Sequence, residues 1–189
     1  RVLFRSEKLS HHVIDEFCFA IYYHFKKRSW KNIMWIWEFL HVLIGILWIG
    51  LLYFFNLVQV QSMPKMTEEG AAKPYTQIIL PRALFFFRHA ALWTVITGIV
   101  YYVMGRGVVE GIPSGEIMIG MLLGIIMAGN VWFIIWPNQK KIIAGELEGD
   151  ALAKAKRNAF LASRTNAWLS IPMLIGMIAA NHGGIMAGF

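Results

Sequence analysis

The sequence has little cysteine and little charge, and each shortage argues against a class of protein. Its one cysteine, Cys18, excludes an intrachain disulfide, a CxxCH haem-attachment motif and a metal cage of cysteines. Only 15% of the 189 residues are charged, while 57% are hydrophobic. Soluble domains carry about 25% charged residues, so the composition argues against a soluble monomer. The first residue is arginine, so we expect the natural chain to begin earlier.

The apolar residues gather into four runs, each long enough to cross a bilayer, which takes about 20 residues. The runs cover approximately residues 33–57, 82–104, 116–136 and 166–188. Helices are expected because the bilayer core offers no partners for open backbone groups. The sequence therefore predicts an all-α, integral membrane four-helix bundle over residues 33–189, placed in a lipid bilayer.

The segments outside these runs have their own patterns. Residues 1–32 predict an amphipathic helix in the membrane interface, or alternatively a partner-binding helix, because apolar residues on one helical face precede Lys26-Lys27-Arg28. Prolines and glycines predict a loop over residues 58–81 and a turn over 105–115, and residues 137–165 predict a charged surface helix. Two stripes of small residues predict close helix contacts; they are Gly120, Gly124 and Ala128, and Gly176, Ala180 and Gly184.

The net charge of +7 comes from 18 Lys and Arg residues against 11 Asp and Glu residues. These charges cluster at the ends of the apolar runs, which favours contact with lipid headgroups or partner subunits and argues against nucleic acid. The two sides of the predicted bundle carry almost equal numbers of Lys and Arg residues, so the positive-inside rule leaves the orientation open.

Five ionisable side chains lie inside the apolar runs, where charge is costly and function is the default hypothesis. They are Glu38, His41, Arg88, His89 and His182. Glu38 and Arg88 lie close enough to a span end to reach the interface by snorkelling. With a rise of about 1.5 Å per residue, His41 and His182 lie about 6–7 Å from the middle of their spans on the same side of the bilayer. His89 lies about 6 Å toward the other side.

Two neutral imidazoles that face each other inside a helical bundle suit the axial positions of a b-type haem. His41 and His182 are therefore the predicted ligands of haem b. The alternative is that these histidines only hydrogen-bond to the backbone or to each other. For His89, the functional hypothesis is a second centre or a polar cavity, and the alternative is a structural role. Small residues beside the predicted pair leave room for the macrocycle; they are Gly45, Ala179 and Gly183.

Three longer motifs are spread over residues 40–182. Residues 40–50 read LHVLIGILWIG, residues 130–141 read NVWFIIWPNQKK, and Ser163-Arg164-Thr165-Asn166 is followed by Pro172 and Asn181-His182. Together they resemble the LHxxxGxxWIG, NVWxxIWPNQK and SRxN…P…NH motifs of the membrane domain of the bacterial membrane-bound urate oxidase (urate hydroxylase) family. The first motif also resembles the membrane protoporphyrinogen oxidases. The matching histidines are His41 and His182.

The resemblance implies the membrane fold, a location in the bacterial inner membrane and the haem site. It implies the substrate less strongly. Members of the family typically end in a cytochrome c domain that accepts electrons, whereas this sequence contains no CxxCH motif. Where the family tends to have a glutamate in a WEA-like segment, this chain has Arg88-His89-Ala90. A changed ionisable residue at that depth argues against urate chemistry.

These observations favour an integral membrane subunit that binds haem b and passes electrons among other subunits of a larger redox complex. A first alternative is a membrane oxidase of urate or another small reductant that depends on a separate cytochrome c. A second alternative is a structural accessory subunit of a membrane complex, without a cofactor.

Overall fold

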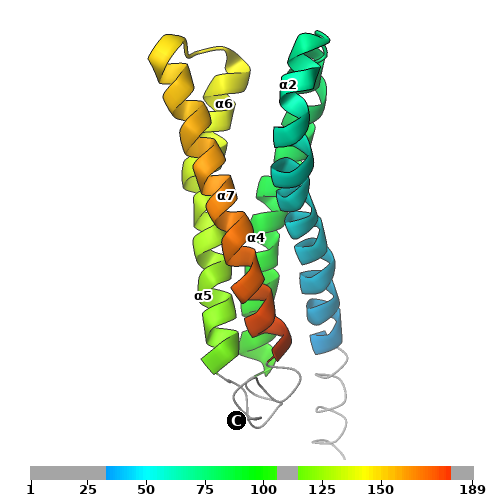
Figure 1. Ribbon diagram of the computed structural model, residues 1–189. Helices are drawn as coiled ribbons and strands as arrows, with labels where there is room; N and C mark the ends of the chain where they lie inside the picture. The colour runs from blue at the N-terminus through cyan, green and yellow to red at the C-terminus, as the bar shows by residue number, and fades with distance from the viewer. Residues whose placement is uncertain (1–32, 106–114, 180–189) are drawn as a thin grey trace, which may run out of the picture.

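The computed structural model describes residues 33–105 and 115–179, and these residues form four long helical rods (Figure 1). The first rod is helical over residues 33–53 and continues through η1 (Phe54–Gln59) and α2 (Val60–Glu68). The second comprises α3 (Ala72–Pro74), η2 (Tyr75–Ile79) and α4 (Leu80–Gly105). The third comprises α5 (Gly115–Gly129), η3 (Asn130–Ile135) and α6 (Trp136–Ala144), and the fourth is α7 (Gly149–Ala179). The prediction of an all-α chain is confirmed for these residues.

The rods run alternately up and down, so both short connections lie at one end of the molecule (Figure 1). We call this the turn end; it holds residues 69–71 and 145–148. The first rod begins and α7 stops at the opposite end. The predicted amphipathic helix over residues 1–32 and the greater part of the predicted turn over 105–115 lie outside the described residues.

Three of the rods are long and apolar enough to cross a bilayer. They cover Ile33–Glu68, Ala72–Met104 and Gly115–Ala144. The chain is therefore a membrane protein by the length and composition of its helices. The fourth rod, α7, begins with a charged half that includes Asp150, Lys154 and Arg157 and continues into an apolar half. A bundle of four membrane-crossing helices stays a prediction.

The predicted loop over residues 58–81 is wrong for most of its length. The first rod stays helical to Glu68, and the second begins at Ala72. Pro64 and Pro81 lie within the rods instead of ending them. A proline removes one backbone donor and crowds the preceding turn, and π-helical turns lie just ahead of both prolines in η1 and η2. These wider turns rearrange the backbone hydrogen bonds locally, whereas α7 continues past Pro172 without such a turn.

The charged stretch over residues 137–165 also differs from the prediction of a separate surface helix. Its first residues extend the third rod to Ala144, where Gly145 closes the helix in the left-handed conformation with φ of 70°. Its remainder is the first half of α7, continuous with the apolar fourth run. A residue with φ in this range is best a glycine, so Gly145 explains why the third rod turns back there.

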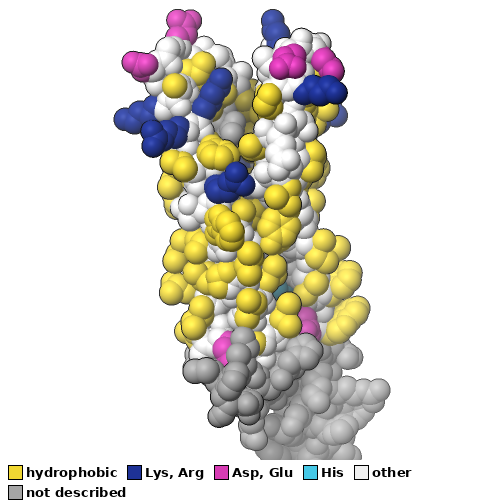
Figure 2. Space-filling model, in the orientation of Figure 1, with side chains coloured by type: hydrophobic (Ala, Val, Ile, Leu, Met, Phe, Trp, Pro, Cys, Tyr) yellow, Lys and Arg dark blue, Asp and Glu magenta, His cyan; other side chains and the backbone are white. Residues whose placement is uncertain are grey.

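The surface divides into an apolar band and a charged collar. Figure 2 shows hydrophobic side chains over most of the visible length and charged side chains gathered at the turn end. The collar includes residues of all four rods and of both connections: Lys65, Glu69, Lys73, Lys140, Lys141, Glu146 and Lys154, among others. This is the pattern expected where helices leave the hydrocarbon core and enter the headgroup region.

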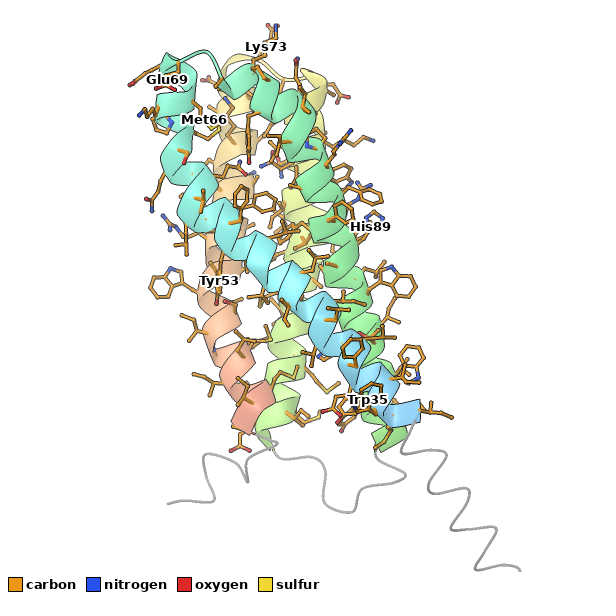
Figure 3. All side chains as sticks on the ribbon, turned by 90° about the vertical axis from the view of Figure 1, so that its right-hand side faces the viewer. Trp35, Tyr53, Met66, Glu69, Lys73 and His89 are labelled. Atoms are coloured by element: carbon orange, nitrogen blue, oxygen red, sulfur yellow. The ribbon has the colours of Figure 1, made fainter. Side chains whose placement is uncertain are left out.

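The first rod leans across the other three, from α7 near its middle to α4 in its lower half (Figure 3). Near the middle, Asn56 hydrogen-bonds to Ser163 of α7. Nearer the opposite end, His41 hydrogen-bonds to Thr94 of α4. Trp48 and Leu52 lie between these two points and are almost completely buried. The first rod therefore joins the second rod to the fourth.

The contact between α5 and α7 brings the two backbones close together. A Cβ atom on Gly176 would lie 2.6 Å from the carbonyl oxygen of Glu116, and one on Gly120 would lie 3.2 Å from that of Met173. The predicted close contact along the small-residue stripes is therefore confirmed for Gly120 and Gly176. Gly124 has nothing within 4 Å of such a Cβ, and Ala180 and Gly184 lie outside the described residues.

Candidate functional site

His41, on the first rod, is held against α4 by a hydrogen bond between its imidazole and the backbone. Its Nδ1 lies 2.9 Å from the carbonyl oxygen of Thr94. A carbonyl oxygen can only accept, so Nδ1 carries the proton and donates it. In the neutral ring, Nε2 is then the unprotonated nitrogen with a free lone pair. The fold thus fixes both the tautomer and the orientation of the ring.

A glycine makes room for this ring. A Cβ atom on Gly98 of α4 would lie 2.8 Å from Cε1 and 3.0 Å from Nδ1 of His41. Gly45, predicted to leave room for a macrocycle, instead faces α4, where its Cβ would lie 3.7 Å from Cγ2 of Thr94. The sequence alone does not single out Gly98. Only the contact between the two rods shows that a side chain at this position would collide with the ring of His41.

Three buried polar side-chain atoms have no hydrogen-bond partner among the described residues: Oγ1 of Thr94, Nε1 of Trp48 and Oδ1 of Asn56. Of these residues, Thr94 is the one that contacts His41. A buried polar atom without a hydrogen bond is costly, and a water, ion or ligand group often satisfies it. The contact around His41 therefore holds one unpartnered hydroxyl, that of Thr94, and the hydroxyl of Thr97 lies 3.5 Å from Nδ1 of His41.

His182, the second predicted ligand, lies outside the described residues. The helix that precedes it, α7, is antiparallel to the first rod and ends at Ala179, at the same end of the molecule as His41 (Figure 1). The hydrogen bond between Asn56 and Ser163 gives the register. His41 lies fifteen residues before Asn56, and Ile178 lies fifteen residues after Ser163. The end of α7 is thus at about the height of His41, although the ring of His41 contacts α4.

His89 lies on a different part of α4 from the His41 contact. Its Nδ1 donates to the carbonyl oxygen of Phe85 at 2.7 Å, one turn earlier on the same helix. Its ring lies 4.2 Å from the ring of Phe85 and 6.0 Å from that of Trp132, measured between centroids. Figure 3 shows it on the side of α4 turned away from the first rod. The structure does not bring His89 together with His41.

Glu38 and Arg88, the two remaining ionisable residues, both have partners that suit a structural role. Glu38 hydrogen-bonds to the hydroxyl of Tyr101 on α4. The guanidinium of Arg88 lies 3.7 Å from the centroid of the Trp136 ring, in a cation–π contact.

Sequence reasoning missed the role of a set of polar side chains that we call the polar clasp. It consists of Asn56, Asn130, Ser163 and Asn166. Asn130 donates to the side-chain oxygen of Asn166 at 2.8 Å, and Asn166 donates to the carbonyl oxygen of Met127 at 2.9 Å. Asn56 donates to the hydroxyl of Ser163 at 2.9 Å. The polar clasp joins α7 to the first and third rods by hydrogen bonds within the apolar interior.

A sequence signal for the polar clasp exists. Ser163, Asn166 and Ser170 recur at helical spacing on one face of α7, and Asn166 and Ser170 are fully buried. The hydroxyl of Tyr53 lies 2.9 Å from that of Ser170, and Figure 3 shows Tyr53 on the side of the first rod nearest α7. Polar residues repeated on one face of a membrane helix indicate contacts between helices rather than with lipid.

Among residues 33–105 and 115–179, no group of three or more His, Cys, Asp or Glu side chains is placed to hold a metal ion. A histidine that would hold a haem does not require such a group, because the porphyrin itself carries the iron. The chemistry available at His41 is therefore that of a single imidazole with its lone pair oriented by the fold.

Comparison with known protein families supports the resemblance seen in the motifs. Residues 112–188 match the family described as urate oxidase N-terminal. No curated protein and no solved structure matches the chain. The matched range contains the motifs at 130–141 and 163–182, including His182, and begins after the motif that contains His41. The similarity of this chain to the urate oxidase N-terminal family is therefore confirmed over residues 112–188.

Proposed function

We propose that this protein is an integral membrane subunit that binds haem b and passes electrons within a larger redox complex. The observation that carries the proposal is the hydrogen bond from Nδ1 of His41 to the carbonyl oxygen of Thr94. Haem-ligating and metal-ligating histidines commonly donate their other ring nitrogen to such an acceptor, which fixes the tautomer and raises the basicity of the ligand. His41 already makes this hydrogen bond in the protein alone.

We propose that His182 would hold the haem iron together with His41. The antiparallel course of α7 and its register against the first rod support this assignment, because they bring the end of the described helix to the height of His41. The residues around His41 fit a haem in their chemistry, since they combine an oriented imidazole with a largely apolar setting. Haem iron would supply reversible one-electron transfer at this site.

The chain's own residues have separate tasks in this proposal. His41 would bind the haem iron through Nε2. The carbonyl oxygen of Thr94 keeps the proton of the imidazole on Nδ1. Gly98 leaves the space that the ring occupies. Trp48 and Leu52 are both buried on the turn-end side of His41. They would exclude water from the contact between the first rod and α4. Burial of this kind is one of the factors that set a haem potential.

The test is the reduced-minus-oxidised absorbance spectrum of the full chain purified in mild detergent. We expect Soret and α bands of b-type haem in the wild-type protein, and their loss in His41→Ala and His182→Ala. His89→Ala is the matched control because His89 lies on the outer side of α4, and we expect it to keep the bands. A wild-type protein without b-type bands would exclude the proposal and would favour a cofactor-free structural subunit.

A second candidate function is a membrane oxidase of urate or another small reductant, with a separate cytochrome c as electron acceptor. The match of residues 112–188 to the urate oxidase N-terminal family favours it. This candidate requires substrate-dependent reduction of added cytochrome c by the purified protein. We expect His41→Ala to abolish that reduction and Lys154→Ala, in the charged half of α7, to leave it intact. If neither urate nor other purines lead to reduction of cytochrome c, a purine oxidase is excluded. The proposed electron-transfer subunit would then be favoured.

A further inference from the structure

A cationic and aromatic cluster lies on the outer face of the second and third rods, separate from the His41 contact. We call it the Arg88 cluster; it consists of Phe85, Arg88 and His89 on α4, Trp132 on η3 and Trp136 on α6. The guanidinium of Arg88 lies 3.7 Å from the centroid of Trp136 and 5.5 Å from that of Phe85. The proposed haem function uses none of these residues.

Arg88 reaches along the rods toward the turn end. Nε1 of Trp132 donates to the backbone carbonyl of Arg88 at 3.0 Å, so the backbone of Arg88 is level with Trp132. Its guanidinium, however, lies over Trp136, one helical turn nearer the turn end. This is the snorkelling geometry of an arginine whose backbone lies in hydrocarbon and whose charge seeks the headgroup region.

A second arginine on another rod points the same way. The guanidinium of Arg164 on α7 lies 5.3 Å from the ring centroid of Phe160, which is also one turn nearer the turn end. Asn130 and Asn166, which hydrogen-bond to each other, place this part of α7 beside η3. Two arginines at similar heights on different rods therefore mark where the apolar band meets the headgroups.

The positive charge of Arg88 is not balanced by the described part of the chain, where no carboxylate lies within 4 Å of it. Further cations lie on the same face instead. Lys140 follows Trp136 by four residues on the third rod, and Arg82 precedes Phe85 by three on α4, so each lies one turn nearer the turn end. Both are exposed. Within residues 33–105 and 115–179, Arg82, Arg88 and Lys140 have no ion-pair partners. The spacing of Arg82 and Lys140 places both on the turn-end side of the aromatic rings.

His89 has a place in this cluster. Its Nδ1 donates to Phe85, so the 3.5 Å approach of Nε of Arg88 to the same nitrogen is a contact rather than a second hydrogen bond. The ring fills the space between Phe85 and Trp132 on the side away from the turn end. Leu92, exposed on the next turn of the same face, continues an apolar surface toward the bilayer centre.

We propose that the Arg88 cluster binds an anionic phospholipid of the turn-end leaflet. Arg82, Arg88 and Lys140 would contact its phosphate, and an acyl chain would lie along Phe85, His89 and Leu92. Basic pockets between membrane helices commonly bind such headgroups. The combination favours a lipid because the cations stand at the edge of the apolar band and an acyl-sized apolar face continues directly below them.

The experiment is native mass spectrometry of the full chain after delipidation in detergent, with added phosphatidylglycerol or phosphatidylcholine. We expect the wild type to retain phosphatidylglycerol in preference to phosphatidylcholine. Arg88→Gln should reduce that preference about fivefold, which is the weight of one basic residue near an anionic surface. Arg164→Gln is the matched control, because it removes an arginine at similar depth without touching the Arg88 cluster, and it should leave the preference within about twofold.

Additional variants separate the possible outcomes. Arg88→Lys should restore most of the preference if its circular dichroism matches wild type, because it keeps the charge. Inorganic phosphate should not displace the lipid, since a free anion lacks the acyl contacts. An equal loss in Arg88→Gln and Arg164→Gln would overturn the proposal in favour of diffuse charge attraction. Unchanged lipid retention in Arg88→Gln would overturn it in favour of another occupant, such as a carboxylate of a partner subunit.

Discussion

Two helix contacts in this molecule are made in different ways. Between α5 and α7, backbone meets backbone at Gly120 and Gly176, and further along the same two rods Asn130 donates to Asn166. Between the first rod and α4, a glycine meets a titratable side chain instead, because Gly98 makes room for the ring of His41. The first contact brings two helices together, whereas the second positions an imidazole.

Gly120 and Gly176 thus allow two helices to pack closely, whereas Gly98 leaves space for a side chain of the candidate site. The α5–α7 contact lies inside the range that matches the urate oxidase N-terminal family, and the His41 contact lies before it. A paired haem site would therefore need one ligand from the matched part and one from the first rod. The tight contact would hold α7 in place so that its end approaches the first rod.

The largest expected effect is at Gly176. A leucine there would place its Cβ 2.6 Å from the backbone oxygen of Glu116, so the two helices would have to separate. We expect Gly176→Leu to lower the free energy of unfolding in mixed micelles by about 3 kcal/mol or more.

The matched control is Gly124→Ala on the same stripe, where nothing lies within 4 Å of the added Cβ. It should change the unfolding free energy by no more than about 1 kcal/mol, in the stabilising direction, from helix propensity alone. Similar losses in the two variants would show that the α5–α7 contact is not as close as described.

An intermediate effect is expected at Gly98. The methyl group of Gly98→Ala would lie 2.8 Å from Cε1 of His41, so the ring must turn away from the carbonyl oxygen of Thr94. We expect a cost of about 1–3 kcal/mol in unfolding free energy, together with a weakened or shifted haem spectrum. Gly45→Ala, whose Cβ would lie at an ordinary 3.7 Å from Thr94, should keep the wild-type spectrum. A normal spectrum in Gly98→Ala would mean that Gly98 does not position His41.

The smallest expected effect is in the polar clasp. Asn166→Ala removes hydrogen bonds to Asn130 and to the carbonyl oxygen of Met127. Hydrogen bonds between membrane helices are worth about 0.6–1.7 kcal/mol, so we expect a loss of about 1–2 kcal/mol in SDS-induced unfolding. Asn138→Ala, which removes only a bond to Ile134 of its own rod, should cost less. Equal losses of unfolding free energy in the two variants would show that the hydrogen bonds between rods add nothing to stability.

The sequence predicted those features of the fold that depend on composition and spacing. Long apolar runs predicted helices, and the glycine stripes predicted the contact at Gly120 and Gly176. The prolines at 64 and 81 misled because their residue type indicates a break, whereas both rods continue past them, as α7 continues past Pro172. Whether a helix continues past a proline depends on its packing against neighbouring rods, and a local sequence pattern does not show that packing.

The candidate site was predictable in its residue type but not in its contacts. His41 stood out because an ionisable group in an apolar run is costly. The carbonyl oxygen of Thr94 and the space at Gly98 did not stand out, since both come from another rod and become relevant only when it packs. The Arg88 cluster is similar: the sequence suggested a snorkelling arginine, and the packing of the third rod supplies Trp132 and Trp136.

The central claim is that His41 and His182 together bind a haem, and the electron paramagnetic resonance spectrum of the oxidised, purified full chain tests it most directly. Two imidazole ligands make ferric haem low-spin, so we predict a low-spin ferric signal in the wild type and in His89→Ala. His41→Ala and His182→Ala should each lose that signal or convert it to high-spin. A wild-type protein with no ferric haem signal, or a low-spin signal that persists in His41→Ala, would contradict the account.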